Sequence, residues 1–232
     1  MSDPLRLALV GASGLVGGAV LALSVGREDV RVTAVARREM KLPAGARMEL
    51  FVADPDKWGE VFEAIRPTAL VCALGTTWRK AGRDEAAFRA VDETLVIETG
   101  RAARAAGVER LVAVSSAGAD PMSRNFYLKV KGETERELAR LGFKRLDILR
   151  PGLLRGARRG DRRPAERLLV AVGPLADAFL HGGLRRYRSI RAEAVARAAL
   201  ALASRKAGGR FVHDNDGILR AAATLALPAA DA

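Results

Sequence analysis

Tyr127 and Lys131 are the two residues of this sequence whose types and spacing best suit chemistry. They lie four positions apart in a predicted helix, 125–141, and that spacing puts both side chains on one helix face. A phenol with a pKa near ~10 is a reluctant proton donor, and a cation within a few ångströms lowers such a pKa by about 1–3 units. Lys131 is therefore expected to make Tyr127 a usable proton donor. The structural alternative is a helix with a half-buried Tyr and a solvated Lys.

Ser116 is the third candidate, because it lies at the carboxyl end of a predicted strand, 110–114. The carboxyl ends of parallel strands form the rim at which such sheets bind their ligands. When a hydride reaches a carbonyl carbon, negative charge grows on the oxygen and must be protonated. The Ser116 hydroxyl can donate to that oxygen while Tyr127 supplies the proton. Ser116, Tyr127 and Lys131 together predict reduction of a carbonyl or oxidation of an alcohol on a small-molecule substrate.

A glycine-rich turn near the N-terminus predicts what supplies the hydride. An apolar run, 5–10, leads into Gly11-Ala12-Ser13-Gly14-Leu15-Val16-Gly17, then a helix-like stretch, 19–25, and a β-branched run, 30–35. Between a strand and a helix, glycines let the backbone approach a pyrophosphate, whose charge the N–H groups of the helix start can hold. The GxxGxxG spacing therefore predicts a dinucleotide site.

The same stretch has a rival interpretation, since residues 7–26 contain no charge over the length of a membrane span. Glycine is poor in an isolated helix, the apolar period changes halfway, and a strand follows directly. The N-terminus also lacks the basic region of a signal peptide. We therefore expect neither a membrane span nor a signal peptide.

The residues after the second and third strands bear on which dinucleotide binds. Arg37 and Arg38 stand about 20 residues beyond Gly17, where an arginine accommodates the 2′-phosphate of NADP. Glu39 leaves NAD open, because a carboxylate there bonds a free ribose hydroxyl. Asp54 ends a strand, 48–52, where it either lies at the adenine or is a turn residue. The prediction is NADP, with NAD as the alternative.

Further strands and helices alternate along the chain. Strands are expected at 69–74, 110–114, 145–149 and 210–213, and helices at 56–65, 84–106, 125–141 and 192–204. This alternation predicts an α/β fold, a doubly wound parallel sheet of the Rossmann type. Leu74, Gly75 and Thr76 at the end of one strand leave room for the cofactor. We expect one domain, 1–232, with 153–232 contributing a small substrate or lid lobe.

Composition narrows the partners. The net charge of +12 attracts anions. Nucleic acid is a disfavoured partner, because aromatic residues make up only 5% of the sequence and no nucleic-acid-binding motif is found. The charge is better explained by a phosphorylated cofactor, an anionic substrate or a solvated surface. The basic segment 155–167 and the apolar stretch 168–180 are either an anion-attracting lid or a solvated loop over a packing helix. The single Cys72 predicts a buried thiol in a cytoplasmic protein, and His181 and His213 are too isolated to predict a metal.

These motifs together resemble the short-chain dehydrogenases/reductases. The likeness rests on the glycine turn, on Ser115-Ser116, on Tyr127-x-x-x-Lys131 and on Leu149-Arg150-Pro151-Gly152. A narrower likeness, to the atypical branch that includes the Tat-interacting-protein oxidoreductases, rests on Leu74-Gly75-Thr76-Thr77, Ser116-x-Gly118-Ala119-Asp120 and Tyr127-Leu128-x-Val130-Lys131-Gly132-Glu133. The resemblance covers most of the chain.

The resemblance implies a Rossmann domain with a small C-terminal substrate lobe, and NADPH as the usual cofactor. It assigns the catalytic serine to Ser116, with Ser115 as the second choice, and the tyrosine and lysine to Tyr127 and Lys131. Cofactor contacts carried over from the family fall on Gly11, Ser13, Gly14, Leu15 and Val16 at the pyrophosphate and on Pro151, Gly152 and Leu153 beside the nicotinamide. Tyr127 and Lys131 are expected to contact the cofactor as well.

Two departures from the family pattern matter. Asp92 stands where many relatives have an asparagine that supports the lysine, which affects the expected proton relay. The segment between Ser116 and Tyr127 is shorter than in sugar-nucleotide epimerases, so their substrates do not transfer. Because members of this branch are often better known for protein partners, an NADPH-binding regulatory protein is the main alternative to an enzyme. A homodimer also stays open.

Overall fold

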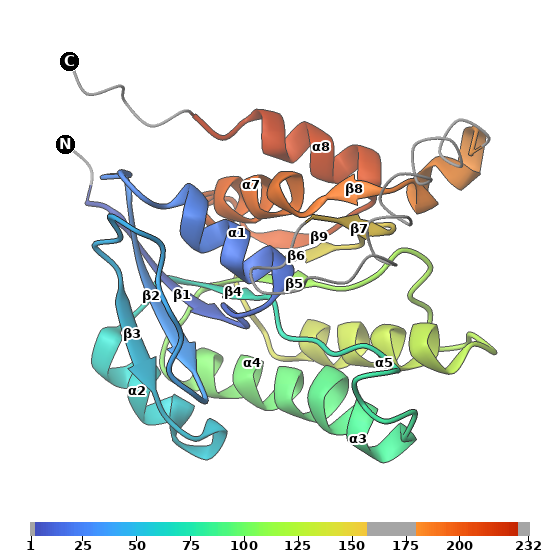
Figure 1. The fold of residues 1–232 in the computed structure, drawn as a ribbon, viewed down its shortest axis with the longest axis horizontal. Coiled ribbons are helices and arrows are strands. Elements are labelled where there is room, and N and C mark those ends of the chain that lie inside the picture. Colours follow the sequence, from blue (N-terminus) through green and yellow to red (C-terminus); the bar gives the residue numbers. More distant parts are fainter. Residues whose placement is uncertain (1–2, 157–179, 227–232) are drawn as a thin grey trace.

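A seven-stranded parallel sheet forms the centre of the computed structural model, which describes residues 3–156 and 180–226 (Figure 1). Its order is β3-β2-β1-β4-β5-β6-β9, and every neighbouring pair is parallel. The strand order reverses between β1 and β4, which makes the crevice beyond these strands the place for a ligand. The strands are β1 (Leu5–Val10), β2 (Val30–Ala36), β3 (Glu49–Val52), β4 (Ala69–Cys72), β5 (Arg110–Val114), β6 (Arg145–Leu149) and β9 (Gly209–His213).

Helices cover both faces of this sheet (Figure 1). One face carries α1 (Leu15–Leu23), α7 (Ala192–Ala203) and α8 (Asn215–Ala223). The other carries α2 (Trp58–Ile65), α4 (Leu95–Ala105) and α5 (Phe126–Arg140), with the short turn η1 (Pro55–Lys57) before α2, and with α3 (Glu85–Arg89) and the π-helical turn η2 (Ala90–Thr94) leading into α4. The predicted doubly wound α/β fold is confirmed.

The covering helices explain the continuous apolar runs in the central strands, from Leu7 to Val10 in β1 and over the whole of β4. In β1, Leu7 and Leu9 pack into the core under α1 and α7, while Ala8 and Val10 point to the opposite core under α2 and α4. All four side chains are buried. A parallel sheet buried on both faces produces continuous apolar runs of this kind rather than alternating ones.

The predicted bounds of the strands agree best with the structure, and the predicted starts of the helices agree least. Strands 5–10, 110–114 and 145–149 lie where expected, whereas α1 begins at Leu15 rather than at 19. The helix expected from 56 begins at Trp58, and Asp56 lies inside η1 instead of capping α2. The helix expected over 84–106 is continuous but contains η2, whose wider turn no residue pattern announces. Helix α8 had no sequence prediction.

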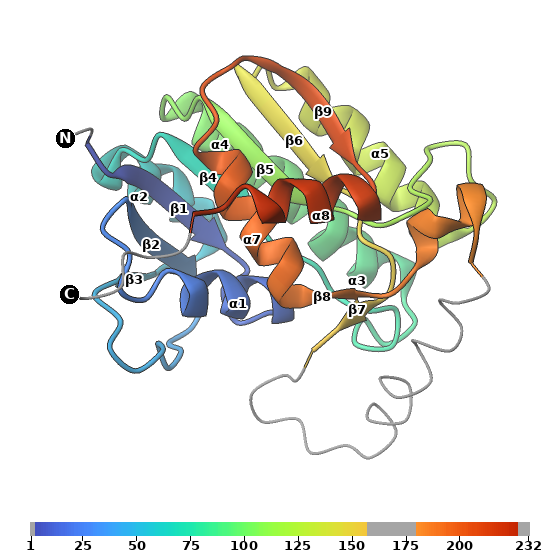
Figure 2. The same ribbon diagram turned by 90° about the horizontal axis from the view of Figure 1, so that it is seen from above.

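A few elements lie outside the main sheet, at its carboxyl end. The strands β7 (Leu154–Arg155) and β8 (Ile190–Arg191) pair with each other, and η3 (Gly182–Tyr187) stands beside α8 (Figure 2). Within the range expected to form a substrate lobe, β9 and α7 belong to the sheet and its cover. Most of the basic segment 155–167 and the apolar stretch 168–180 falls in 157–179, outside the described residues, so both interpretations of it stay predictions.

The uncharged stretch 7–26 folds as a strand, a turn and a short helix. No helix in the described part of the chain is long and apolar enough to cross a membrane.

Candidate active site

The glycine turn between β1 and α1 lies at the point where the strand order reverses. Gly11 has a φ of +80°, and a Cβ there would lie 2.4 Å from the Ala73 carbonyl at the end of β4. A Cβ at Gly17 would lie 2.2 Å from the Gly11 oxygen. Both positions therefore require glycine, because the turn is wedged between the start of α1 and the β4 strand end.

The start of α1 has the properties of a pyrophosphate cradle. Gly14 occupies the N-cap position and offers no side chain to the first-turn N–H groups, and that turn contains no acidic residue. Ser13 is exposed, Leu15 is half-buried and Val16 is buried behind them. A helix start with uncapped N–H groups and no opposing carboxylate suits a phosphate group. The residues present therefore fit the cofactor that the sequence predicts.

The residues expected at the adenosine end lie at the neighbouring strand ends. Arg37 and Arg38 follow β2 and are exposed, as is Glu39. Asp54 follows β3, whose Val52 pairs with Ala36 of β2, so it reaches the same edge of the sheet. Asp54 is exposed and makes no capping hydrogen bond. The structure thus brings both predicted contacts together without deciding which cofactor they select.

Lys131 is held in a buried ion pair with Asp92. The Lys131 ammonium lies 2.7 Å from Asp92 Oδ1, and the two side chains are 8% and 1% exposed. The second oxygen, Asp92 Oδ2, accepts the Thr76 N–H at 2.7 Å. A Cβ on Gly75 would lie 3.4 Å from Asp92 Oδ1 and 3.8 Å from Lys131 Nζ. The pair therefore sits directly under the β4 loop, Leu74 to Thr76, that is expected to contact the cofactor.

This pairing decides the protonation of Lys131. Burial by itself lowers the pKa of Lys131, but the negative charge of Asp92, assisted by Tyr127 and by the hydrogen bond to Asp92, outweighs burial and raises that pKa above its ordinary value. Lys131 is charged at neutral pH. The π-helical turn η2 makes the contact possible, because it carries Asp92, and Thr134 of α5 donates to the Asp92 carbonyl at 3.0 Å.

Tyr127 lies in an aromatic cluster at the start of α5. Its ring centroid is 5.6 Å from that of Phe88, and Phe88 also contacts Phe126 and Trp78. The N-cap Asn125 accepts the Leu128 N–H at 3.1 Å and starts the helix that presents Tyr127 and Lys131. Tyr127 is half-buried. Packing on one side of the ring limits its rotation and fixes where the hydroxyl can reach.

The two adjacent serines have different surroundings. Ser115 Oγ donates to Glu135 at 2.5 Å, and the same carboxylate forms an ion pair with Arg150 at 2.5 Å. Ser116 Oγ has only a marginal contact, 3.5 Å to the Ala117 carbonyl. Successive residues of an extended chain point to opposite sides, so Ser115 is fixed under the sheet and Ser116 keeps a free hydroxyl. This arrangement favours Ser116 over Ser115 for the catalytic role.

Pro151 and Gly152 are anchored by a residue that sequence reasoning missed. The Pro151 carbonyl accepts the Ala117 N–H at 2.8 Å, and the Gly152 N–H donates to Asn215 Oδ1 at 2.8 Å. Asn215 is buried and its amide also donates to the Arg188 carbonyl. A Cβ on Gly152 would lie 2.1 Å from that carbonyl oxygen, while the side chain of Leu153 is 55% exposed. The one signal in the sequence is the predicted strand 210–213, which ends shortly before Asn215 and brings it to the carboxyl end of the sheet.

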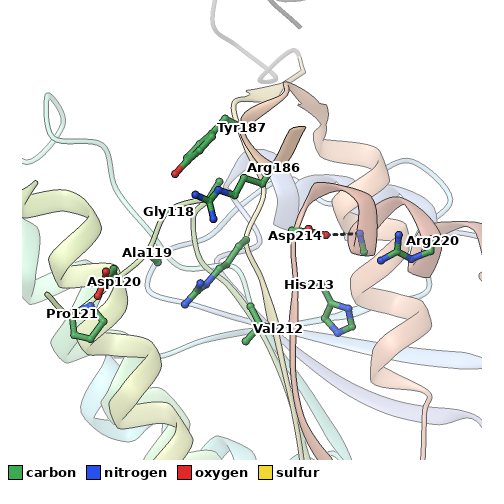
Figure 3. Close-up of a pocket in the computed structure, with 13 residues that line it drawn as sticks. Gly118, Ala119, Asp120, Pro121, Arg186, Tyr187, Val212, His213, Asp214 and Arg220 are labelled. Carbon is green, nitrogen blue, oxygen red and sulfur yellow. Dashed lines mark hydrogen bonds between the residues drawn. The ribbon is translucent and has the colours of Figure 1, made fainter. Parts of the chain in front are cut away.

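A cavity of about 800 Å³ opens beyond the ends of β5, β6 and β9 (Figure 3). Its walls come from the loop after Ser116, from η3 and from the start of α8. The charged lining residues are Arg150, Arg186, Arg220, Asp120 and Asp214, and His213 also lines the cavity. Tyr187 borders it, with its hydroxyl 3.2 Å from the Cβ position of Gly118. Neither arginine of η3 and α8 was among the predicted site residues, because nothing in the sequence relates them to Ser116.

Cys72 is buried at the end of β4, as predicted. Burial is the main cause that raises the pKa of its thiol from 9.0 to about 11. The described residues contain no group of three or more His, Cys, Asp and Glu side chains arranged to hold a metal ion.

The chain is similar to several known proteins. Residues 11–206 match a family model described as NAD(P)H-binding. The chain is 36% identical over 202 residues to "Protein fmp52, mitochondrial" of Aspergillus fumigatus, covering 84% of this chain and 85% of that protein. It is 38% identical over 158 residues to "Protein FMP52, mitochondrial" of Saccharomyces cerevisiae, covering 67% and 68%.

Solved structures show the same fold at low identity. UDP-glucose 4-epimerase from Brucella ovis in complex with NAD superposes with a TM-score of 0.68 at 17% identity, over 90% of this chain and 76% of that chain. MoeE5 in complex with UDP-glucuronic acid and NAD gives 0.70 at 17% identity, over 90% and 75%.

The names of the relatives correct one expectation. A cytoplasmic location was predicted from the single buried cysteine, but the curated relatives are named as mitochondrial proteins. The prediction is wrong because one buried thiol reflects packing and carries no information about the compartment.

Proposed function

Because the chain belongs to the NAD(P)H-binding family of short-chain dehydrogenase/reductase type, we propose that it is an NADP-dependent oxidoreductase acting on a small carbonyl or alcohol. The single observation that carries this proposal is the placement of Tyr127, Lys131 and a free Ser116 hydroxyl at one edge of the sheet, together with the α1 cradle. A structural helix would not need a buried, charged lysine beneath the cofactor loop.

The nicotinamide cofactor, when bound, supplies or accepts the hydride. In the direction of reduction, Tyr127 donates a proton to the substrate oxygen and Ser116 donates a hydrogen bond to it. Lys131 keeps positive charge near the phenol, and Asp92 holds the ammonium in one position. Gly11, Ser13, Gly14, Leu15 and Val16 would hold the pyrophosphate. The cofactor loop, Leu74 to Thr76, and the segment Pro151 to Leu153 would flank the nicotinamide end.

The preference for NADP over NAD rests on Arg37 and Arg38. Both guanidinium groups are exposed at the end of β2, where a 2′-phosphate would lie. Neither forms an ion pair with a carboxylate in the part of the chain that the structure describes. Two uncommitted positive charges at this place support the phosphorylated cofactor, and Glu39 beside them supports NAD.

One observation favours a second candidate, an NADPH-binding regulatory protein that acts through a protein partner. The Asp92 carboxylate offsets the positive charge of Lys131 within the site, where many relatives have an uncharged asparagine. A charged lysine that is paired with a carboxylate lowers the pKa of a neighbouring phenol less than an unpaired one, which would suit a protein that binds the cofactor without rapid turnover.

A carbonyl panel with NADPH oxidation as readout separates the two candidates. Saturable oxidation of NADPH that depends on one class of carbonyl supports the enzyme. Tight NADPH binding by calorimetry without turnover of any carbonyl, or of any alcohol with NADP, favours the regulatory protein. Failure to bind either dinucleotide would sink both.

A further inference from the structure

The cavity beyond β5, β6 and β9 adjoins the loop that follows Ser116 and the residue that precedes Pro151. Ala117 and Gly118, which directly follow Ser116, form part of its wall, and Arg150, which directly precedes Pro151, forms another. The Ala117 N–H and the Pro151 carbonyl are joined by a hydrogen bond of 2.8 Å. The cavity wall therefore begins one residue beyond Ser116 in the chain. A volume of about 800 Å³ is in the range of small-molecule sites.

Two arginines of this cavity have no carboxylate partner. Arg186 of η3 and Arg220 of α8 enter from different elements (Figure 3), and neither forms an ion pair with a described carboxylate. Arg186 lies over the ring of Tyr187, with its Cζ 5.0 Å from the ring centroid. Arg185 differs from its neighbour Arg186 in both respects. It lies outside the cavity lining, and it pairs with Asp216 at 3.4 Å. Arg150 is likewise committed to Glu135.

The acidic side chains of the lining are directed to the backbone. Asp120 Oδ1 accepts the Met122 N–H at 2.8 Å, and Asp214 Oδ1 accepts the Gly217 N–H at 2.8 Å and caps α8. The ring of His213 is bound to the buried Asp147 at 2.8 Å. Each of these three side chains has a partner, whereas Arg186 and Arg220 have no carboxylate partner among the described residues and are the cationic groups that a ligand can satisfy.

We propose that this cavity binds the anionic end, a carboxylate or a phosphate, of the carbonyl substrate, with Arg186 and Arg220 as its recognition residues. The inference rests on the proposed function, because it assigns the substrate class of the same site. Guanidinium groups bind carboxylate and phosphate oxygens through paired N–H donors, and such charge-assisted bonds are the strong ones. An oxo acid or a phosphorylated carbonyl would thus be held by its charge and present its carbonyl to Ser116 and Tyr127.

The test compares oxo acids with their neutral methyl esters in NADPH-dependent reduction. The wild type should prefer the acid by about tenfold or more in kcat/KM, as expected for the loss of one charge-assisted contact. Arg186→Gln and Arg220→Gln should each reduce that preference by about tenfold and leave the ester rate in place. Arg185→Gln is the matched control and should keep the preference of the wild type.

A second arm does not depend on turnover. Inorganic phosphate is titrated with NADPH at saturation, so that the α1 cradle is filled, and its binding is followed by the shift in the thermal unfolding midpoint. Phosphate binding should weaken by about tenfold in Arg186→Gln and Arg220→Gln and stay unchanged in Arg185→Gln.

Equal turnover of acids and esters, or an acid preference that survives both substitutions, overturns the inference and leaves the proposed oxidoreductase in place. If no carbonyl is turned over, the proposed reaction fails, and the phosphate arm decides the cavity alone. Phosphate binding that depends on both arginines supports the proposed anion site. Phosphate binding that does not depend on them contradicts it.

Discussion

The buried ion pair of Lys131 and Asp92 is the residue-scale feature that distinguishes this site from the family pattern. It connects α5, the turn η2 and the cofactor loop through two oxygens of one carboxylate. Removing one partner of such a buried pair strongly destabilises the fold, because the remaining buried charge has no opposite charge beside it. Asp92 is therefore both a structural residue and the group that sets the charge of Lys131.

Asp92→Asn should destabilise the protein by about 3–5 kcal/mol at neutral pH, because it leaves the buried ammonium unpaired. Without the carboxylate, burial dominates and lowers the pKa of Lys131, so the alkaline fall in NADPH affinity should move to lower pH. Urea denaturation and calorimetric titration across the pH range measure both effects. Glu98→Gln, which breaks the exposed pair with Arg101, is the control and should change stability by less than about 1 kcal/mol. A pH profile unchanged in Asp92→Asn would contradict this account of Lys131.

Tyr127→Phe should lower turnover about 10² to 10⁴-fold, the usual contribution of general acid catalysis. The phenyl ring keeps its packing against Phe88, so the free energy of unfolding and the affinity for NADPH should stay close to those of the wild type. Steady-state kinetics on an active carbonyl provide the measurement, with denaturation and calorimetry as controls. Wild-type turnover in this variant would exclude Tyr127 as the proton donor.

At the scale of elements, the contact between α5 and the loop that follows β5 determines where Tyr127 and Lys131 stand. Gly132 lies in α5 directly against this loop, and a Cβ there would meet the Pro121 nitrogen at 2.2 Å and the Asp120 carbonyl carbon at 2.3 Å. Backbone atoms cannot move away as a flexible side chain can. The helix therefore approaches the loop only because position 132 has no side chain.

Gly132→Ala should destabilise the protein by about 1–3 kcal/mol or more through overpacking, and should lower turnover by displacing α5. Gly59→Ala in α2 is the matched control, since its nearest neighbour is the Ala102 Cβ at 3.8 Å. That variant should be neutral or more stable by up to about 1 kcal/mol. Chemical denaturation of both variants decides between them. Equal stability of the two would mean that the close approach of α5 is not required.

The end of β2 is the element expected to choose between cofactors. NADPH should bind more tightly than NADH, and Arg37→Gln with Arg38→Gln should reduce that preference by about tenfold for each arginine, or ~1.4 kcal/mol. Affinity for NADH should change little, because NADH lacks the 2′-phosphate. Calorimetry with both cofactors measures the difference. A preference for NADH that Glu39→Ala abolishes would reverse the assignment.

At the scale of the whole molecule, two buried groups make the free energy of unfolding depend on pH in the alkaline range. Burial raises the pKa of Cys72 from 9.0 to about 11, and the pKa of Lys131 is also raised. A group whose pKa is higher in the folded state stabilises fully below its unfolded pKa and loses that contribution as pH rises through the folded value. Both groups therefore act in the same direction, Cys72 from about pH 9 upward and Lys131 only above its ordinary pKa of 10.5.

The free energy of unfolding should fall between pH 9 and pH 11, with about 2–3 kcal/mol of the loss due to Cys72. Cys72→Ala removes that titration, so its unfolding free energy should fall less steeply over the same range even though the variant starts from a lower value. Urea denaturation at four or five pH values measures the slopes. Identical slopes in the two proteins would show that the thiol is not the group responsible.

The sequence by itself determined the features that arise from local pattern. The mainly apolar segments 5–10, 110–114 and 145–149 predicted β1, β5 and β6 with their observed ends, because a strand buried on both faces needs a largely apolar sequence. The glycine spacing before α1 predicted the turn, since positions 11 and 17 tolerate no Cβ. Tyr127 and Lys131 lie on one face of α5 because they are four residues apart in a helix.

Only the tertiary structure decided which side chains become partners. Ser115 and Ser116 are equivalent in sequence, and the position of Glu135 on α5 commits the first and leaves the second free. Asp92 reaches Lys131 because η2 packs against α5, and Asn215 reaches Gly152 across 63 positions of chain. Arg186 and Arg220 share a cavity only after η3 and α8 pack together. The physical reason is that periodicity fixes the face of one element, whereas contacts between elements depend on how their packed surfaces align.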